Sequence, residues 1–171
     1  GMKVLAVAYK PLNQETISQD DENSLTLLGY LAFFDAPKQS AAAAIEKLHR
    51  LHVDVRVLTG DNQDVAVSIC RRLGIDTMHT LTGAELELLT DNEIPVKLEH
   101  TTVFSELSPK QKVQVVRTLR ANGHTVGFLG DGMNDLPAIV ESDVGISVDT
   151  AAETVKEVAD VVLLKKDLNV L

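Results

Sequence analysis

The chain has 171 residues, of which 44% are hydrophobic, and its 16 basic and 25 acidic residues give a net charge of −9. This length fits one domain with a sheet covered by helices, and the hydrophobic content excludes wholesale disorder. The acidic balance argues against a nucleic-acid groove, which needs clustered Lys and Arg, and no apolar run approaches the roughly 18 residues of a membrane span.

The first half of the chain alternates short apolar runs with segments of helical spacing. Strands are predicted over residues 4–9, 27–34 and 53–58. Helices are predicted over residues 41–51, 65–73 and 82–89. The polar, acidic stretch 11–24 is typical of a connection, and Gly74 is expected to end the second helix. The lone cysteine, Cys70, lies on the apolar face of that helix and is expected in the core.

The second half of the chain continues the alternation. Strands are predicted over residues 102–104, 125–129, 144–148 and 161–164. Ser108 and Gln111 form a capping-box pattern with Pro109 in the first helical position, so a helix is predicted to begin there. Thr150 and Glu153 repeat the capping-box pattern and predict the start of a last helix.

Apolar strands alternating with amphipathic helices predict an α/β fold, a Rossmann-like, mainly parallel sheet with helices on both faces. In such sheets ligands bind at the carboxyl ends of the strands. Three polar clusters follow predicted strands, at residues 59–61, 105–112 and 131–135. The fold is therefore expected to bring together segments that are distant in sequence.

Asp131 follows a predicted strand directly, between Gly130 and Gly132, and Asp135 comes shortly after it. Two carboxylates held together repel each other unless a cation lies between them. Oxygen ligands without His or Cys nearby favour Mg²⁺ over zinc or copper. The alternative is a solvated Asp-Gly turn, but the whole block GDGMNDLP after a strand favours a magnesium site with Asp131 and Asp135 as ligands.

Lys112 is predicted in the first turns of a helix, where the helix macrodipole disfavours a cation. It aligns with Val116 and Leu119 on the packed face of that helix, so its ammonium is expected to reach toward the strand ends. The alternative is a misplaced surface lysine. At the strand ends, the ammonium would neutralise phosphoryl oxygens or hold a carboxylate nucleophile.

Thr59 ends a predicted strand and precedes Gly60. Its hydroxyl and the nearby backbone N–H groups are predicted to bind a phosphate at the start of the next helix. The alternative is a simple turn in which Asp61 or Asn62 caps that helix. The expected position of this turn, at the same sheet edge as the other two polar clusters, favours the phosphate site.

Three motifs occur in the order Thr-Gly-Asp, Pro-x-x-Lys and Gly-Asp-Gly-x-Asn-Asp-x-Pro-Ala. In this order they resemble the phosphorylation domain of P-type ATPases, a branch of the haloacid dehalogenase-like superfamily. The resemblance runs along the whole chain. The segments GYLAFFDAPK, VRVLTGDN, HTVGFLGDGMND and DVGISVD, with the closing EVADVVLLKKDLNVL, look most like the magnesium-transporting subfamily.

The resemblance implies catalytic and nucleotide-binding roles for four of the matched residues. Thr59 would bind the phosphoryl group and would also serve in ATP binding. Gly60 and Asp61 would lie near the phosphates and the ribose of the nucleotide. Lys112 would contact the phosphates and stabilise the phosphorylated aspartate.

The resemblance also implies the metal site and the cofactors. Asp131 and Asp135 would bind Mg²⁺, and Asn134 with Asp135 would shape the metal and phosphate site as catalytic residues. Mg²⁺ and ATP are therefore the expected cofactor and substrate of the parent protein. In that parent, a cation pump of the cell membrane, an aspartyl phosphate would couple ATP hydrolysis to ion movement, with Mg²⁺ as the expected ion.

The nucleophile of the family lies in an Asp-Lys-Thr-Gly-Thr motif, and no such sequence occurs among the 171 residues. The resemblance therefore implies a fragment that lacks the nucleophile-bearing strand. Residues 1–25 would be the return segment from the nucleotide-binding domain, and residues 26–171 the C-terminal part of the phosphorylation domain.

Such a fragment is expected to be soluble and inactive alone, and to lie on the cytoplasmic side of the membrane in the parent. Its expected partners are the nucleotide-binding, actuator and transmembrane domains of the pump, with no nucleic acid. Loss of a strand near the centre of the sheet would uncover backbone and apolar groups. Marginal stability or self-association is therefore expected.

Two other functions are open at this point. A stand-alone phosphatase of the same superfamily would use Asp35 as its nucleophile, after the predicted strand 27–34. Against it, Pro37 occupies the position where such phosphatases usually carry a second Asp. A catalytically silent regulatory module would use the acidic site at residues 131–135 to sense Mg²⁺.

Overall fold

The computed structural model describes residues 2–13, 16–33, 39–165 and 167–170. The chain divides into two units, Gly1–Ala36 and Pro37–Leu171. The predicted boundary after residue 25 falls inside the first unit, because the strand Thr26–Phe33 pairs with the strand at the start of the chain. The candidate nucleophile Asp35 lies outside the described residues.

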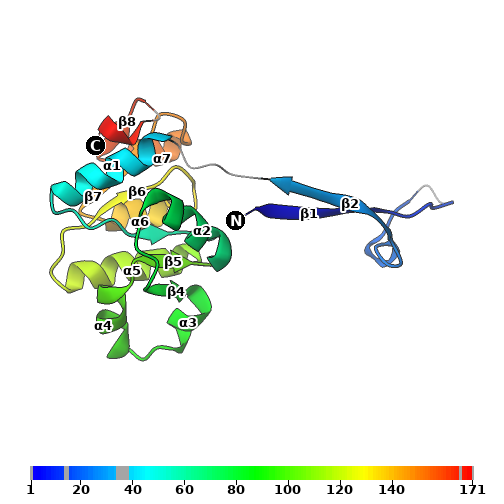
Figure 1. Cartoon of the computed structure of the whole chain (residues 1–171), viewed down its shortest axis with the longest axis horizontal. Coiled ribbons are helices and arrows are strands. Elements are labelled where there is room, and N and C mark those ends of the chain that lie inside the picture. The colour runs from blue at the N-terminus through cyan, green and yellow to red at the C-terminus, as the bar shows by residue number, and fades with distance from the viewer. Residues whose placement is uncertain (1, 14–15, 34–38, 166, 171) are drawn as a thin grey trace. The chain divides into compact units, whose positions relative to one another are not determined.

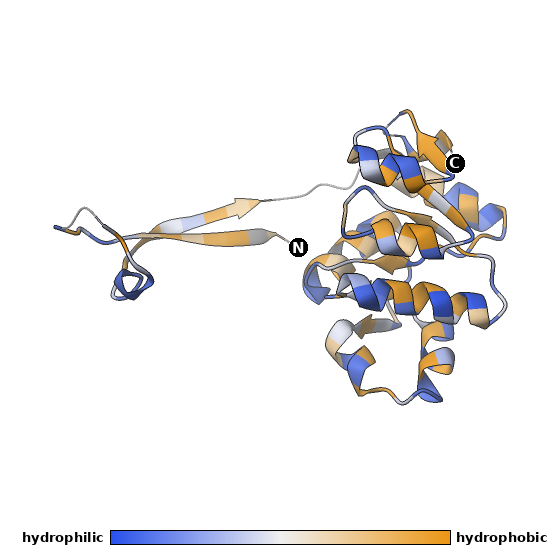
Figure 2. Ribbon diagram, turned by 180° about the vertical axis from the view of Figure 1, so that it is seen from behind, coloured by the Kyte–Doolittle hydropathy of each residue, from blue (hydrophilic) through white to orange (hydrophobic). Residues whose placement is uncertain are grey.

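In the first unit, strands β1 (Lys3–Tyr9) and β2 (Thr26–Phe33) form an antiparallel hairpin (Figure 1), with the short 3-10 helix η1 (Gln19–Asp21) in their connection. Successive side chains of a strand point to opposite faces. Apolar residues recur along both strands (Figure 2). Seven of them are between 51% and 68% exposed, namely Val4, Leu5, Leu27, Leu28, Tyr30, Leu31 and Phe33. Within the described residues, the hairpin therefore exposes apolar side chains on both faces.

The second unit contains two parallel sheets of three strands each. In the first, β5 (Val103–Ser105) lies between β3 (Val57–Leu58) and β4 (Thr80–Thr82). In the second, β7 (Val144–Val148) lies between β6 (Gly127–Leu129) and β8 (Val161–Leu163). The predicted parallel pairing is confirmed, but the single predicted sheet is divided, because no strand within the described ranges joins β3 to β6.

Helices precede, connect and follow the parallel strands, and parallel pairing requires such connections. They are α1 (Gln39–Arg50), α2 (Gln63–Leu73), α3 (Gly83–Leu88), α4 (Glu93–His100), α5 (Pro109–Ala121), α6 (Leu136–Glu141), α7 (Glu153–Val158) and the short 3-10 helix η2 (Leu168–Val170). None of the helices in the described part of the chain is long and apolar enough to cross a membrane.

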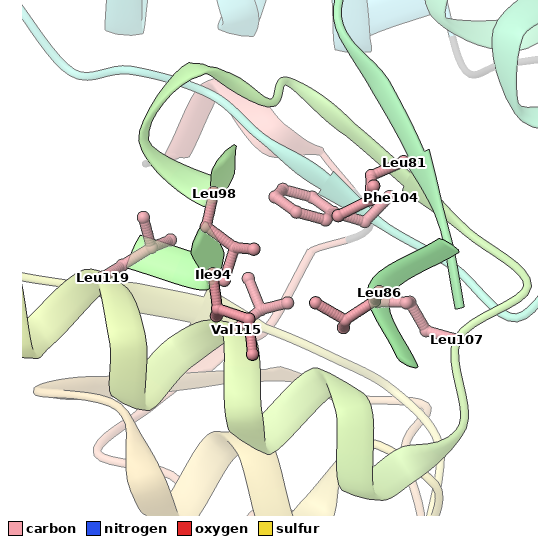
Figure 3. Close-up of a cluster of buried hydrophobic side chains, with 8 residues drawn as sticks. All are labelled: Leu81, Leu86, Ile94, Leu98, Phe104, Leu107, Val115 and Leu119. Atoms are coloured by element: carbon pink, nitrogen blue, oxygen red, sulfur yellow. The ribbon is translucent and has the colours of Figure 1, made fainter. Parts of the chain in front are cut away.

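The two sides of β5 pack against different helices. Val103 belongs to a buried cluster with residues of α1 and α2, among them Cys70, which is 0% exposed. Phe104, the next residue, belongs to a second cluster (Figure 3) with Leu81, Leu86, Ile94, Leu98, Leu107, Val115 and Leu119. Helices therefore cover both faces of this sheet, and the predicted α/β fold class and the buried position of Cys70 are confirmed.

Capping residues explain where α5 begins and where α2 ends. The capping box of Ser108 and Gln111 begins α5 with Pro109 in its first turn, as predicted. Gly74 ends α2 with φ of 75°, a left-handed conformation that suits glycine, also as predicted. The predicted capping box of Thr150 and Glu153 is wrong, because Thr150 lies in a turn and Ala152 is the N-cap of α7 without a side-chain bond.

The hairpin leads us to expect that the 171-residue chain self-associates, because a two-stranded hairpin with apolar side chains on both faces needs a cover. Replacing Leu28 and Tyr30 on β2 together by Ser should weaken the association, as measured by sedimentation velocity. The matched control is Met78→Ser, which removes a side chain that is 83% exposed in the second unit. A wild-type chain that stays monomeric, with an unfolding midpoint independent of protein concentration, would contradict this expectation.

Candidate active site

Lys112 lies on the packed face of α5. The start of this helix is fixed because the Oγ of Ser108 accepts the N–H of Gln111 at 3.3 Å, and the Oε1 of Gln111 accepts the N–H of Ser108 at 2.8 Å. Lys112 is 8% exposed, and Val116 and Leu119 on the same face are buried. The predicted alignment of Lys112 with the packed face is confirmed, and the alternative of a surface lysine is wrong.

The ammonium of Lys112 donates a hydrogen bond to the Oδ1 of Asp135 at 2.6 Å. The two side chains are 10% and 17% exposed, so the ion pair is largely shielded from water. Asp135 is the N-cap residue of α6, yet its carboxylate makes no capping bond in its own helix. The pair joins α5 to α6, and the carboxylate offsets the unfavourable position of a cation near a helix N-terminus.

Gly130 makes the room that Asp135 occupies. A Cβ added to Gly130 would lie 2.5 Å from the Cβ of Asp135 and 3.1 Å from its Oδ2. The N–H of Gly130 donates to the carbonyl oxygen of Ile146 at 3.0 Å, and the N–H of Asp135 donates to that of Gly132 at 2.9 Å. The loop between β6 and α6 is therefore closed tightly, and any larger residue at position 130 would displace the carboxylate.

Two arginines further along α5 hold it against the segment around the end of α6. Arg117 pairs with Glu141 at 2.8 Å, and Arg120 pairs with Asp143 at 2.8 Å. The hydrogen bond from Arg117 holds the pKa of Glu141 below its usual range. The pKa of Asp143 is lowered by the N–H of Val126 and then by Arg120. Each exposed pair contributes little energy, but together they orient the helix that carries the buried ion pair.

Asp131 and Asn134 lie on the exposed side of the loop between β6 and α6. In the part of the chain that the structure describes, neither side chain makes a hydrogen bond or an ion pair. Their oxygen atoms are thus available to a ligand. The loop is also tied to α7, because the hydroxyl of Thr154 donates to the Sδ of Met133 at 3.0 Å. No local pattern predicts that contact, because it depends on the packing of α7.

Thr59 follows β3 and turns the chain toward α2. Its N–H donates to the carbonyl oxygen of Phe104 at 2.9 Å. Its hydroxyl accepts the N–H of Asp61 at 3.0 Å and donates to the Oδ2 of Asp61 at 3.3 Å. Asn62 caps α2 by accepting the N–H of Asp64 at 2.9 Å. The capped turn of the alternative interpretation is therefore present, with Asn62 as the cap. The phosphate-binding role of Thr59 stays a prediction.

The segment 106–112 contacts both parts of the candidate site. At its start, the N–H groups of Glu106 and Leu107 donate to carbonyl oxygens of the Thr59 turn at 2.9 and 3.0 Å. At its end, Lys112 forms the buried ion pair with α6. The structure therefore places the predicted residues in two groups, one at the end of β3 and one after β6, and this segment connects them.

The residues after β6 fit a magnesium ion. Within the described residues, no group of three or more His, Cys, Asp or Glu side chains could hold a metal. Mg²⁺ does not require such a group, because it is usually bound through one or two carboxylates, with water and phosphate in the remaining positions. Asp131 offers an exposed carboxylate, while Oδ1 of Asp135 is engaged by Lys112. The assignment of Mg²⁺ to Asp131 and Asp135 stays a prediction.

Comparison with known proteins gives a consistent family. A family model described as haloacid dehalogenase-like hydrolase matches residues 4–143. Two relatives are named "Magnesium-transporting ATPase, P-type 1". The one from Salmonella typhimurium strain LT2 is 49% identical to this chain over 175 residues, and the one from Escherichia coli K12 is 42% identical over 173 residues. Both alignments cover 100% of this chain and 19% of the relative. "Calcium-transporting ATPase 1" of Bacillus cereus is 34% identical, over 95% of this chain and 19% of the relative. The chain thus spans about a fifth of the length of these relatives.

The buried ion pair predicts strong energetic coupling between Lys112 and Asp135. Lys112→Met should lower the free energy of unfolding by about 2 to 3 kcal/mol, because it leaves a shielded carboxylate without its cation. The double variant with Asp135→Asn should lose less than the sum of the two single losses. The measurement is urea unfolding of all four chains.

The exposed pair on the same helix supplies the control for this cycle. Arg117→Met removes the partner of Glu141, and the side chain of Arg117 is 66% exposed. It should lower the free energy of unfolding by less than about 1 kcal/mol. Losses at Lys112 and Asp135 that add to within about 0.5 kcal/mol would show that the two groups are not coupled.

Proposed function

The chain belongs to the haloacid dehalogenase-like hydrolase family, and we propose that it is the phosphorylation-domain portion of a P-type ATPase that transports Mg²⁺. The higher identity to the magnesium-transporting relatives than to the calcium-transporting one supports Mg²⁺ as the transported ion. In the parent protein, phosphoryl transfer from ATP to an aspartate would drive ion movement.

The observation that carries this proposal is the buried ion pair of Lys112 and Asp135 beside the exposed carboxylate of Asp131. A shielded cation next to an available anion suits a site where phosphoryl charge must be neutralised. A purely structural ion pair would not need an exposed acid in the same loop. We therefore assign phosphoryl transfer, and not structural support, to this group.

The proposed roles follow from the chemistry of each side chain. The hydroxyl of Thr59 would turn its proton from Asp61 toward a phosphoryl oxygen, while Gly60 allows the close approach of that group. Asp61, at the start of α2, would lie near the phosphates and ribose of ATP. The ammonium of Lys112 would stabilise the negative charge that develops during transfer.

Asp131 and Asp135 are proposed to hold Mg²⁺, and Asn134 to orient the loop and the phosphate. When bound, Mg²⁺ would neutralise phosphate oxygens and align them for in-line attack. Two other residues of the chain support this site. Gly130 keeps Asp135 in place, and Lys112 offsets the repulsion between the carboxylates of Asp131 and Asp135.

The nucleophile is proposed to come from polypeptide outside these 171 residues, since no Asp-Lys-Thr-Gly-Thr sequence occurs in them. The arrangement of the sheets supports this. Within the described strands, β3 pairs only with β5, and β6 pairs only with β7. Leu58 of β3 and Val126 beside β6 each pack against both large hydrophobic clusters. We propose that the nucleophile-bearing strand adds at these edges, and that the chain is inactive without it.

The remaining domains of the pump are the proposed partners. The apolar hairpin β1–β2 supports a covered position against the nucleotide-binding domain, because its exposed side chains on both faces need a partner in water. By the same proposal, the domain lies on the cytoplasmic side of the membrane in the parent and is soluble when isolated. The actuator and transmembrane domains complete the proposed parent.

Magnesium binding can be measured on the isolated chain. Titration with Mg²⁺, followed by amide NMR, should shift signals of residues 131–135. Asp131→Asn should weaken binding by at least about tenfold, because it removes a direct ligand. The matched control is Asp91→Asn, which removes another exposed acid from the same unit. Equal Mg²⁺ affinity in the wild type and in Asp131→Asn would contradict the metal assignment.

Phosphorylation tests the proposed function itself. The chain is mixed with a second polypeptide that carries the Asp-Lys-Thr-Gly-Thr strand and the nucleotide-binding domain, and with Mg²⁺ and ATP labelled in its terminal phosphate. Acid-stable label on the second polypeptide is expected, and Asp131→Asn or Lys112→Met in the chain should abolish it.

Two other outcomes would contradict the proposal. A well-folded complex without label would favour a Mg²⁺-sensing module. Hydrolysis of p-nitrophenyl phosphate by the chain alone, lost in Asp35→Ala, would favour a stand-alone phosphatase.

A further inference from the structure

Glu106 has a backbone conformation that non-glycine residues seldom adopt. It follows β5 with φ of 56°, in the left-handed region. A side chain there brings strain, so the conformation persists only where surrounding contacts hold it. The carbonyl oxygen of Glu106 would lie 2.5 Å from a Cβ added to Gly83, so the start of α3 packs directly against this peptide. The strained conformation is therefore held on one side by α3 and on the other by the turn at residues 59–61.

The backbone and the side chain of Glu106 hold the same turn. Its N–H donates to the carbonyl oxygen of Asp61 at 2.9 Å. Its Oε1 accepts from the side-chain amide of Asn62 at 2.9 Å and from the N–H of Gln63 at 3.2 Å. One residue thus binds three successive residues, which follow Thr59 and Gly60 and begin α2.

The carboxylate of Glu106 neither belongs to the buried core nor caps α2. The residue is exposed, and Asn62 already caps α2 through the N–H of Asp64. Its charge alone would hinder a phosphate, because an anion near the turn repels another anion. What the carboxylate supplies is an acceptor at a fixed distance from the turn, which keeps the chain after Thr59 from opening.

We propose that Glu106 is a positioning residue that holds the turn at residues 59–61 in the conformation that receives a phosphate. The inference rests on the proposed phosphoryl-transfer function and adds a residue to it. Nothing in the sequence singles out Glu106, because an exposed glutamate after a strand is typical of a solvated loop. Only the tertiary contacts give it this role.

Two substitutions separate the effect of the length of the Glu106 side chain from the effect of its charge. Glu106→Gln keeps an acceptor oxygen at the same distance and removes the charge. Glu106→Asp keeps the charge and withdraws the acceptor by one methylene group. A positioning role predicts that the Gln variant behaves like the wild type and that the Asp variant is impaired.

The probe is inorganic phosphate, titrated into the 171-residue chain at saturating Mg²⁺ and followed by the amide NMR signals of Thr59 and Gly60. Glu106→Asp should weaken phosphate binding by about tenfold, as expected for lost hydrogen bonds to a charged group. Glu106→Gln should stay within about twofold of the wild type. The Mg²⁺-induced shifts at residues 131–135 should be the same in all three chains.

The matched control is Glu93→Asp, because Glu93 also bridges the start of a helix. Its Oε2 accepts the N–H of Thr90 at 2.9 Å and the hydroxyl of Thr90 at 2.7 Å, at the start of α4. This variant should lose stability without losing phosphate affinity. A loss of phosphate affinity as large as that of Glu106→Asp would mean that general destabilisation explains both, and would overturn the proposal.

The remaining outcomes are equally distinct. Wild-type phosphate affinity in Glu106→Asp, or equal weakening in the Asp and Gln variants, would overturn the positioning role while leaving the proposed function intact. If phosphate fails to shift Thr59 in the wild type although Mg²⁺ still shifts residues 131–135, the phosphate role of the turn fails, and the role of Glu106 fails with it.

Discussion

The ion pair between Lys112 and Asp135 is the contact on which the rest of the candidate site depends. Each charge alone would be unfavourable where it lies, the ammonium near a helix N-terminus and the carboxylate in the same loop as a second acid. Paired at 2.6 Å, they stabilise each other and leave Asp131 exposed. The tight contact at Gly130, the capping box at the start of α5 and the arginine pairs further along that helix all serve the geometry of this one pair.

The same dependence extends to the other half of the candidate site. The segment that carries Lys112 begins at Glu106, whose strained conformation holds the turn after β3. A shift of α5 would therefore affect both groups of residues at once. This connection suits a site in which a phosphate must meet a hydroxyl, an ammonium and a metal together. It also explains why the two parts keep their relation although β3 and β6 belong to separate sheets.

Local signals in the sequence predicted the elements well where the side chains themselves decide the backbone. The strand Val144–Val148, the capping box at Ser108 and the stop at Gly74 agree with the structure. The predicted strand 53–58 is shortened to Val57–Leu58, because its partner β5 is itself only 3 residues long. Between residues 76 and 100, the sequence pattern does not predict β4, because 3 residues are too few to show alternation. In the same stretch, the pattern of α4 is weak because the helix has 8 residues and buries only Ile94 and Leu98.

The α/β class, the family motifs and the chemical types of the site residues follow from the sequence alone, because periodicity, caps and motif spacing are local properties of the chain. Three features became visible with the folded chain: Lys112 meets Asp135, β2 pairs with β1 in a unit of its own, and Glu106 holds the turn after β3. These are contacts between residues far apart in sequence. Their geometry depends on how helices pack across the sheets, and no local pattern records that packing.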